Sequence, residues 1–357
     1  MSAAHATVDL DDVEGLLNAD RAGLLRAASM GGAQVRATAS ALEEGVLDSL
    51  RSDLPPRSVS WVATHGPAAT AGTLLGAALG GSMAAPFVVA SEVPPWLGAL
   101  DVLVVAGDHP GDPVLAAAAA TGIRRGARVV IVAPEEGPLR EVAAGRAVVL
   151  SPRLTVPEDF GLMRYFAAGL AILRVIDSGM QMDLAALADD LDAEALRNSA
   201  GRESFTNPAK RLAERMSGRR VVLAGDNAAT LVLARHTSAF MLRVGLEVMA
   251  AAELSDALVA VPSGLAAAAS DYETSLFHDE ELDGPLPARV RTVVLTTGEE
   301  RSVLATRLAG FEDIDLISAE DVPDVAAPTS GGRPEQQLAL MAVRLEMAAV
   351  YLRLARG

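Results

Sequence analysis

The sequence predicts an α/β protein built from two doubly wound parallel sheets. Short runs rich in valine alternate with longer stretches whose apolar residues recur at helical spacing. Continuous apolar strands separated by helices are typical of a parallel sheet that is covered on both faces. The alternation occurs twice within 357 residues, a length that suits two domains of ordinary size. We therefore expect two similar α/β domains in tandem, with further helices at both ends of the chain.

The first series of strands follows an acidic and helical lead over residues 1–50. The two prolines of RSDLPPRS interrupt the helical pattern at residues 51–58. Five valine-rich runs with helical sequence between them then predict strands at 58–64, 85–91, 101–107, 127–133 and 145–151. These elements define a first domain over residues 51–175.

Two amphipathic stretches, 160–176 and 184–198, predict helices between the domains, and we place a helical connection at 176–206. The second domain is expected over 207–325. It has predicted strands at 218–226, 256–262, 289–297 and 314–320, and a helical region from 228 to about 252. A last helix over about 334–356 lies in a C-terminal segment, 326–357, and is expected to dock on the body of the protein or on a second subunit.

Composition excludes several classes of function. A net charge of −16 argues against nucleic acid, which is bound through clustered lysine and arginine. The absence of cysteine excludes disulfides, thiolate catalysis and zinc bound by cysteine. The single lysine, Lys210, lies in a helix that Asn207 caps, and we expect it to be solvated, so a Schiff base or a P-loop is not supported. No apolar run reaches the roughly 20 residues that span a bilayer, and no signal-like segment begins the chain, which predicts a cytoplasmic protein without a membrane partner.

Two polar turns follow the first and third predicted strands. In a doubly wound sheet of this kind these strands are neighbours, so both turns open on one crevice at the carboxyl edge of the sheet. We expect six residues to line that crevice: Thr64, His65, Gly66, Gly107, Asp108 and His109.

His65 and His109 are the chemically informative residues of this crevice. Either imidazole could act as a general acid or base near neutral pH, or both could be polar turn residues in a decayed site. A third histidine at metal-ligand spacing is absent, and we expect neither a metal nor a cofactor. Asp112 followed by Pro113 predicts a capped helix start, whose carboxylate opposes a phosphate. The turn therefore suits a cation, a neutral sugar or no ligand.

In the second domain, Asp226 and Asn227 occupy the equivalent turn, where we expect them to cap the next helix more than to touch substrate. His236 could face a second subunit or the site. The charged segment FHDEELDGP, 277–285, lacks the spacing of an oxygen-ligand calcium loop and is expected to be an exposed loop.

Several segments resemble the bifunctional phosphoglucose/phosphomannose isomerases of the sugar isomerase (SIS) superfamily. NPAKRLAERMSGRRVVLAG at 207–225 and VYLRLARG at 350–357 are similar to sequences of that family, which also has two tandem α/β domains. The resemblance covers most of the chain in order and spacing. It implies two SIS-type domains, a homodimer, and binding of hexose phosphates or related small molecules.

The motifs that carry the chemistry of this family are altered. Its Gly-Gly-Ser turn is Thr-His-Gly-Pro at 64–67, and its phosphate-wrapping Ser-Gly-Asn-Thr turn is GDHPGDP at 107–113. Arg243 stands where the resemblance implies a catalytic glutamate. Glu253 matches the family, but Asp256 stands where its catalytic histidine is expected.

Two functions remain as expectations. The first is hexose 6-phosphate aldose–ketose isomerisation, from glucose or mannose 6-phosphate to fructose 6-phosphate, with Glu247 or Glu253 as the base and His65, His109 or His236 as the proton carrier. Such a base must lie in a dry pocket, and solvation on a helix surface is the alternative for both glutamates. The second is a catalytically inactive SIS protein that binds a sugar derivative or a partner protein in a regulatory or scaffolding role. The sequence does not decide whether the chain is an enzyme.

Overall fold

A computed structural model describes residues 7–260, 290–311, 313–321 and 332–356. The chain forms two compact units: the first is Arg26–Leu196, and the second combines Met1–Leu25 with Arg197–Gly357. The helices α2 (Leu24–Ala28) and α8 (Leu184–Arg197) contain the two points at which the chain passes from one unit to the other. The charged segment 277–285 lies outside the described residues.

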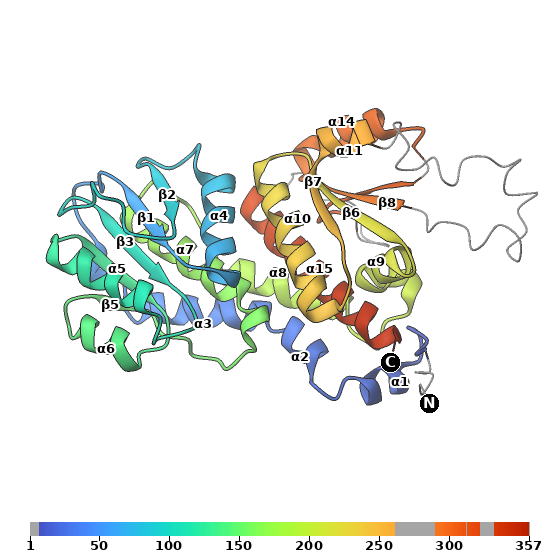
Figure 1. The fold of residues 1–357 in the computed structure, drawn as a ribbon, viewed down its shortest axis with the longest axis horizontal. Helices are drawn as coiled ribbons and strands as arrows, with labels where there is room; N and C mark the ends of the chain where they lie inside the picture. Colours follow the sequence, from blue (N-terminus) through green and yellow to red (C-terminus); the bar gives the residue numbers. More distant parts are fainter. Residues whose placement is uncertain (1–6, 261–289, 312, 322–331, 357) are drawn as a thin grey trace, which may run out of the picture. The chain divides into compact units, whose positions relative to one another are not determined.

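The first unit contains a five-stranded parallel sheet in the order β2-β1-β3-β4-β5 (Figure 1). Each strand lies within a run that the valine pattern predicts, although each is shorter than that run. The strands are β1 (Val59–Val62), β2 (Phe87–Ala90), β3 (Val102–Ala106), β4 (Arg128–Val132) and β5 (Val148–Val149). The parallel sheet expected from the sequence is therefore confirmed here.

Helices cover both faces of this sheet, which explains why the strands are apolar throughout. On one face, leucine, valine and isoleucine of β3 and β4 pack with α5 (Pro113–Arg124) and α6 (Gly137–Ala143) in one buried cluster. On the other face, the Trp61 indole donates to the carbonyl of Ala68 in α4 (Gly66–Leu79) at 3.0 Å. The remaining elements are α3 (Gly31–Glu43), η1 (Asp48–Leu50), η2 (Glu158–Phe160) and α7 (Leu162–Ile176), and α7 packs against both α3 and α4.

Two helical glycines make room for the tryptophan. A Cβ on Gly72 of α4 would overlap the Trp61 ring, and a Cβ on Gly169 of α7 would overlap Leu75 and lie 3.2 Å from Trp61. Interiors are packed too densely to absorb such additions without displacement. The small residues of this alanine- and glycine-rich sequence therefore let the helices approach β1 closely.

The second unit contains a four-stranded parallel sheet in the order β7-β6-β8-β9, formed by β6 (Arg220–Gly225), β7 (Ala250–Glu253), β8 (Val290–Leu295) and β9 (Ile314–Ile317). Ala224 of β6 and Val294 of β8 pack in one buried cluster with α11 (Leu254–Ala260) and α14 (Gly298–Leu308). The helix α10 (Ala228–Phe240) packs on β6 and β7, and α15 (Pro334–Arg356) packs against α10 and α9 (Pro208–Met216). The predicted last helix is confirmed. The shorter elements are α1 (Val13–Ala19), η3 (Ser204–Thr206) and the π-helix η4 (Met241–Gly245).

The strand predicted at 256–262 is wrong over its described part, because residues 254–260 form α11. A short apolar run does not distinguish a strand from a buried helix, and here Leu254 and Ala257 are buried three positions apart, as on a helix. The strand lies instead at 250–253, inside the region expected to be helical. Its sequence Ala-Ala-Ala-Glu is extended because it pairs with β6, so tertiary pairing overrides local preference.

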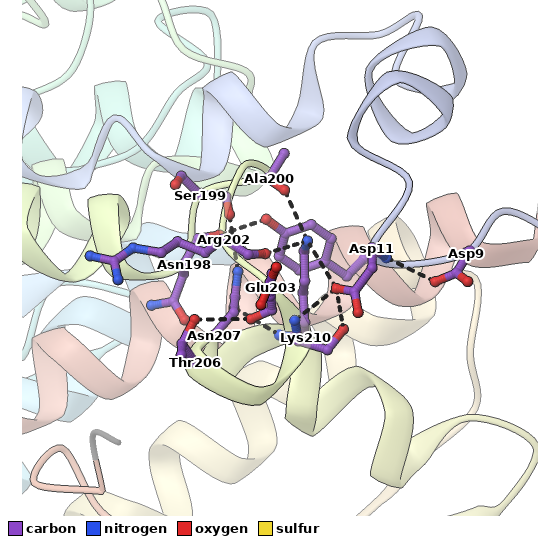
Figure 2. A network of polar contacts seen from close by, with 12 residues as sticks. Asp9, Asp11, Asn198, Ser199, Ala200, Arg202, Glu203, Thr206, Asn207 and Lys210 are labelled. Carbon is purple, nitrogen blue, oxygen red and sulfur yellow. Dashed lines mark hydrogen bonds and ion pairs between the residues drawn. The ribbon is translucent and has the colours of Figure 1, made fainter. Parts of the chain in front are cut away.

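The expectation that Lys210 is solvated is also wrong. Its side chain is fully buried, and Nζ donates to the carbonyl oxygens of Ala200 at 2.9 Å and of Arg202 at 2.6 Å (Figure 2). The carboxylate of Asp11 lies 3.9 Å away and accepts from both the amide and the hydroxyl of Ser204. Burial lowers the pKa of the Lys210 ammonium. The sole lysine thus fastens the loop before α9 and the N-terminal segment of the second unit.

Within the described residues, no helix combines the length and the apolar composition that crossing a membrane requires.

Candidate functional site

The turns after β1 and β3 meet at one edge of the first sheet. The strands are parallel neighbours, with Val59 opposite Val102 and Val62 opposite Val105, so both chains leave the sheet on the same side. The imidazole rings of His65 and His109 lie 6.0 Å apart between centroids, and both side chains are exposed. The expected approach of these two histidines, which are far apart in sequence, is confirmed.

Thr64 links the two turns. Its Oγ1 donates to the Asp112 carboxylate at 3.1 Å and lies 2.9 Å from Nδ1 of His65. A hydroxyl has one proton, so with that proton directed at Asp112 the contact to His65 requires a donating Nδ1–H. In the neutral imidazole, this tautomer leaves Nε2 of His65 as a proton acceptor at the crevice.

Asp112 caps α5, as the sequence predicts. Its Oδ1 accepts from the backbone amide of Val114 at 2.8 Å, and Pro113 occupies the first helical position. The carboxylate therefore occupies the place at the helix start where an anionic ligand would receive its hydrogen bonds.

Asp108, in the turn after β3, forms an ion pair with a residue of α7. Arg164 forms an ion pair with its carboxylate and also donates to the Tyr165 hydroxyl at 2.7 Å. Both ionic side chains are mostly buried, with 15% exposure for Arg164 and 16% for Asp108. Burial raises the pKa of the Tyr165 phenol, which stays neutral. The positive charge nearest to this turn is thus already neutralised by the turn itself.

Glycine and glutamate complete the crevice. Gly66 begins α4 with φ of +67°, the left-handed region that favours glycine, and Gly107 is buried at the end of β3. His109 Nδ1 lies 3.6 Å from the Glu158 carboxylate, and both side chains are more than half exposed. Among the described residues, no group of three or more histidine, aspartate or glutamate side chains has the geometry of a metal site.

The electrostatics of this crevice disfavour a phosphate. A phosphate about 4 Å from Asp112 would be repelled by about 4 kcal/mol per pair of charges at an effective dielectric constant of 20. Glu158 adds a further negative charge, while Arg164 is already paired with Asp108. A neutral hydroxylated ligand or a cation encounters no such penalty.

In the second unit, the equivalent turn is that of Asp226 and Asn227 after β6, and its side chains hydrogen-bond the start of α10. Asn227 accepts from the amides of Ala229 and Thr230, and Thr230 accepts from the Asn227 amide, which together form a capping box for α10. Asp226 accepts from the hydroxyls of Thr230 at 2.7 Å and Thr296 at 2.6 Å. The expected capping role is therefore confirmed for Asn227, whereas Asp226 bonds two threonine hydroxyls and caps no backbone amide of the described helix.

The three residues of the second unit that were considered for catalysis, Glu247, Glu253 and His236, do not contact one another through hydrogen bonds or ion pairs in the described part of the chain. Glu247 forms an ion pair with Arg356 of α15 and is mostly buried, whereas Glu253 is exposed at the end of β7. His236 is almost fully buried, and its Nε2 lies 3.6 Å from the Glu346 carboxylate. Arg243, at the position of the family base, is exposed in η4, and Asp256 is exposed in the first turn of α11.

Sequence reasoning missed three residues of the first crevice: Arg164, Tyr165 and Glu158. The first two lie in a helix whose other residues are almost all apolar and buried, so a buried arginine there was the available signal. A charge in the interior requires a partner, and the acidic turn after β3 supplies one. Glu158 carries no comparable signal, because a surface glutamate before a helix is common.

Comparison with protein-family models gives no match, and neither does comparison with curated proteins. Solved structures do match over nearly the whole chain. A candidate phosphosugar isomerase from Clostridium difficile 630 has a TM-score of 0.62 at 12% identity, over 93% of each chain. The tagatose-6-phosphate ketose/aldose isomerase of Escherichia coli has a TM-score of 0.56 at 16% identity, over 100% of this chain and 95% of the other. A glucose-6-phosphate isomerase-like protein from Thermus thermophilus has a TM-score of 0.54 at 20% identity, over 98% and 96%. At such identities the similarity shows the fold alone.

Proposed function

We propose that this chain, which has the fold of solved phosphosugar isomerases, binds a neutral or cationic sugar derivative at the crevice after β1 and β3. The proposal rests mainly on the turn after β3, which has two carboxylates where a phosphate-wrapping turn needs free backbone amides. Asp112 accepts the first amide hydrogen bond of α5, and Asp108 neutralises Arg164. In this proposal the imidazoles of His65 and His109 hydrogen-bond sugar hydroxyls, and Glu158 accepts from a further hydroxyl or an ammonium group.

Ligand binding at this crevice can be followed through the two histidines. We expect glucose or glucosamine to shift the imidazole NMR signals of His65 and His109, and glucose 6-phosphate to shift them less. Asp112→Asn keeps a capping side chain but removes its negative charge. We therefore expect glucose and glucose 6-phosphate to shift the histidine signals of this variant by more similar amounts. Asp183→Asn is the matched control, because Asp183 also accepts from a helix-start amide, that of Ala186, outside the crevice. If neither glucose nor glucosamine shifts the imidazole signals of His65 or His109, the proposal is overturned.

A second function, hexose 6-phosphate isomerisation, is favoured by one observation. With the Thr64 hydroxyl donating to Asp112, the neutral imidazole of His65 carries its proton on Nδ1 and has Nε2 as a proton acceptor. Isomerisation through an enediol needs a base that takes the proton from C2 of the aldose and an acid that gives a proton to the carbonyl oxygen on C1. In the second half the base returns its proton to C1, and the hydroxyl on C2 gives its proton back to the acid group and becomes the ketone. Glu247 and Glu253 remain candidates for the base, but Glu247 is paired with Arg356 and Glu253 is exposed, so neither is an unpaired carboxylate in a dry pocket.

Incubation with glucose, mannose or fructose 6-phosphate separates the two functions. The binding proposal expects no interconversion above a buffer blank. Interconversion that is lost in Glu247→Gln, Glu253→Gln or His65→Gln would replace it with the isomerase function. Interconversion that persists in all three variants would indicate a contaminating enzyme and leave binding as the function to which the histidine signals respond.

A further inference from the structure

A cavity of about 400 Å³ lies in the second unit, between α9, the carboxyl end of β9 and α15. This volume falls within the range of small-molecule sites, about 300–1,000 Å³. Its apolar surface comes from Leu212, Leu316 and Ile317. None of the residues expected from the sequence to bind or to react lines this cavity.

One wall of the cavity carries arginines. Arg211 and Arg215 stand one turn apart on α9, so both side chains project from the same face of the helix. Arg215 is held by Asp315 at 3.2 Å. Arg211 is partly exposed, and no ion pair or side-chain hydrogen bond joins it to another described residue.

A third arginine lines the cavity from α15. The Arg344 side chain is almost completely buried, and its two terminal nitrogens donate to the carbonyl oxygens of Ser318 at 2.8 Å and Ala319 at 3.0 Å. These bonds fix the guanidinium beside the loop that follows β9. Guanidinium groups bind carboxylate and phosphate well because they present several donors in one plane.

The lining of the cavity also includes one acidic group that is available to a ligand. Asp321 is occupied, since it pairs with Arg301 and accepts from the Ser318 amide at 2.8 Å. Glu320 is partly exposed, and no hydrogen bond or ion pair of its side chain with another described residue is present. A carboxylate accepts hydrogen bonds from hydroxyl or ammonium groups. The same cavity is thus lined by an anion receptor, Arg211, and by a hydrogen-bond acceptor, Glu320.

We propose that this cavity is a binding site for a small organic anion, a phosphate or a carboxylate, that also carries hydroxyl or amino groups. The anionic group binds Arg211 beside the fixed guanidinium groups of Arg215 and Arg344, and a hydroxyl or amino group donates to Glu320. The site is independent of the crevice after β1 and β3. The two sites also differ in the charge that they offer to a ligand, because that crevice has carboxylates where this cavity has a free arginine.

Calorimetric titration of the full chain at low ionic strength tests the site with four probes: glucose 6-phosphate, gluconate, inorganic phosphate and glucose. We expect both organic anions to bind with one site per chain, inorganic phosphate to bind more weakly, and glucose to give no signal that depends on Arg211. Arg211→Gln is expected to weaken the binding of both organic anions at least tenfold. Glu320→Gln is expected to weaken the binding of the organic anions but to leave the affinity for inorganic phosphate unchanged or higher.

Arg307→Gln is the matched control, because Arg307 is an exposed arginine on α14 outside the cavity, and it is expected to change nothing. Arg211 has no partner among the described residues whose loss could unfold the protein, and circular dichroism verifies that each variant is folded. Binding that is unchanged in Arg211→Gln, or equally weakened in Arg307→Gln, overturns the proposal, as does the absence of any binding. The histidine NMR signals report on the first crevice, whereas the Arg211 and Glu320 variants report on this cavity. A negative result at one site therefore leaves the test of the other site unaffected.

Discussion

Replacing Asp108 with asparagine removes the internal anion that Arg164 binds in the first unit. Removing one partner of a buried ion pair destabilises a protein by about 3–5 kcal/mol, since the other charge stays buried. Both side chains retain some contact with solvent, at 15% and 16% exposure, and the Tyr165 hydroxyl remains a partner of Arg164. We therefore expect Asp108→Asn to lower the free energy of unfolding of the first unit by about 3 kcal/mol, the low end of that range.

An added anion is then expected to restore part of this stability. The freed guanidinium binds phosphate, and a ligand at 100 times its dissociation constant stabilises the folded state by about 2.7 kcal/mol. The assay is urea unfolding followed by tryptophan fluorescence, in phosphate and in chloride at equal ionic strength. Both tryptophans, Trp61 and Trp96, lie in the first unit, so the signal reports on the unit that carries the change.

Phosphate also stabilises proteins in general by exclusion from their surface, so a matched variant is required. Asp101→Asn removes the partner of Arg57, whose side chain is 54% exposed and forms no enclosed receptor for an anion. We expect phosphate to raise the unfolding midpoint of Asp108→Asn clearly more than that of Asp101→Asn or the wild type. Equal shifts in all three proteins would refute the reasoning, as would an Asp108→Asn variant as stable in chloride as the wild type.

Three further predictions concern the stability of the two units. Burial raises the pKa of Asp101, but hydrogen bonds from an arginine, a backbone amide and a serine outweigh it and leave the pKa lowered. Its contribution is therefore present above the unfolded pKa of about 3.9 and lost below it, so the difference in unfolding free energy between wild type and Asp101→Asn is expected to shrink in urea titrations below about pH 4. Lys210→Met leaves two backbone carbonyls without their donor, and thermal unfolding is expected to show a loss of about 2–4 kcal/mol. Gly225→Ala places a Cβ against the backbone nitrogen of Leu231 and is expected to lower the melting temperature, whereas Gly201→Ala, in open space, is not.

The fold was accessible from the sequence because the valine-rich strands are buried on both faces. Such strands read as continuous apolar runs whatever surrounds them. β7 escaped detection because Ala-Ala-Ala-Glu carries no strand signal, and only its pairing with β6 makes it extended. Lys210 was misjudged for a related reason, since the carbonyls that receive its ammonium belong to a loop that sequence patterns do not place.

The first crevice was partly accessible for a geometric reason. Strand order fixes which turns share an edge, so the approach of His65 and His109 follows once β1 and β3 are neighbours. The pairing of Arg164 with Asp108 does not follow, because it joins a turn to a helix 56 positions further along the chain. Strand order alone does not determine where that helix packs. The roles of Glu247, Glu253 and His236, and the homodimer that the family resemblance implies, stay predictions.

The path of the chain has a consequence for the order in which this protein is made. Residues 26–196 form a unit that is complete once they have left the ribosome, and such domains generally fold during synthesis. The second unit has to wait, because its N-terminal segment finds its partners only much later: Asp11 bonds Ser204, 193 positions on, and the amide of Val8 bonds the carbonyl of Ala355. Residues 7–25 therefore leave the ribosome before the first unit, but the full set of their contacts with the second unit can form only after α15 has been synthesised.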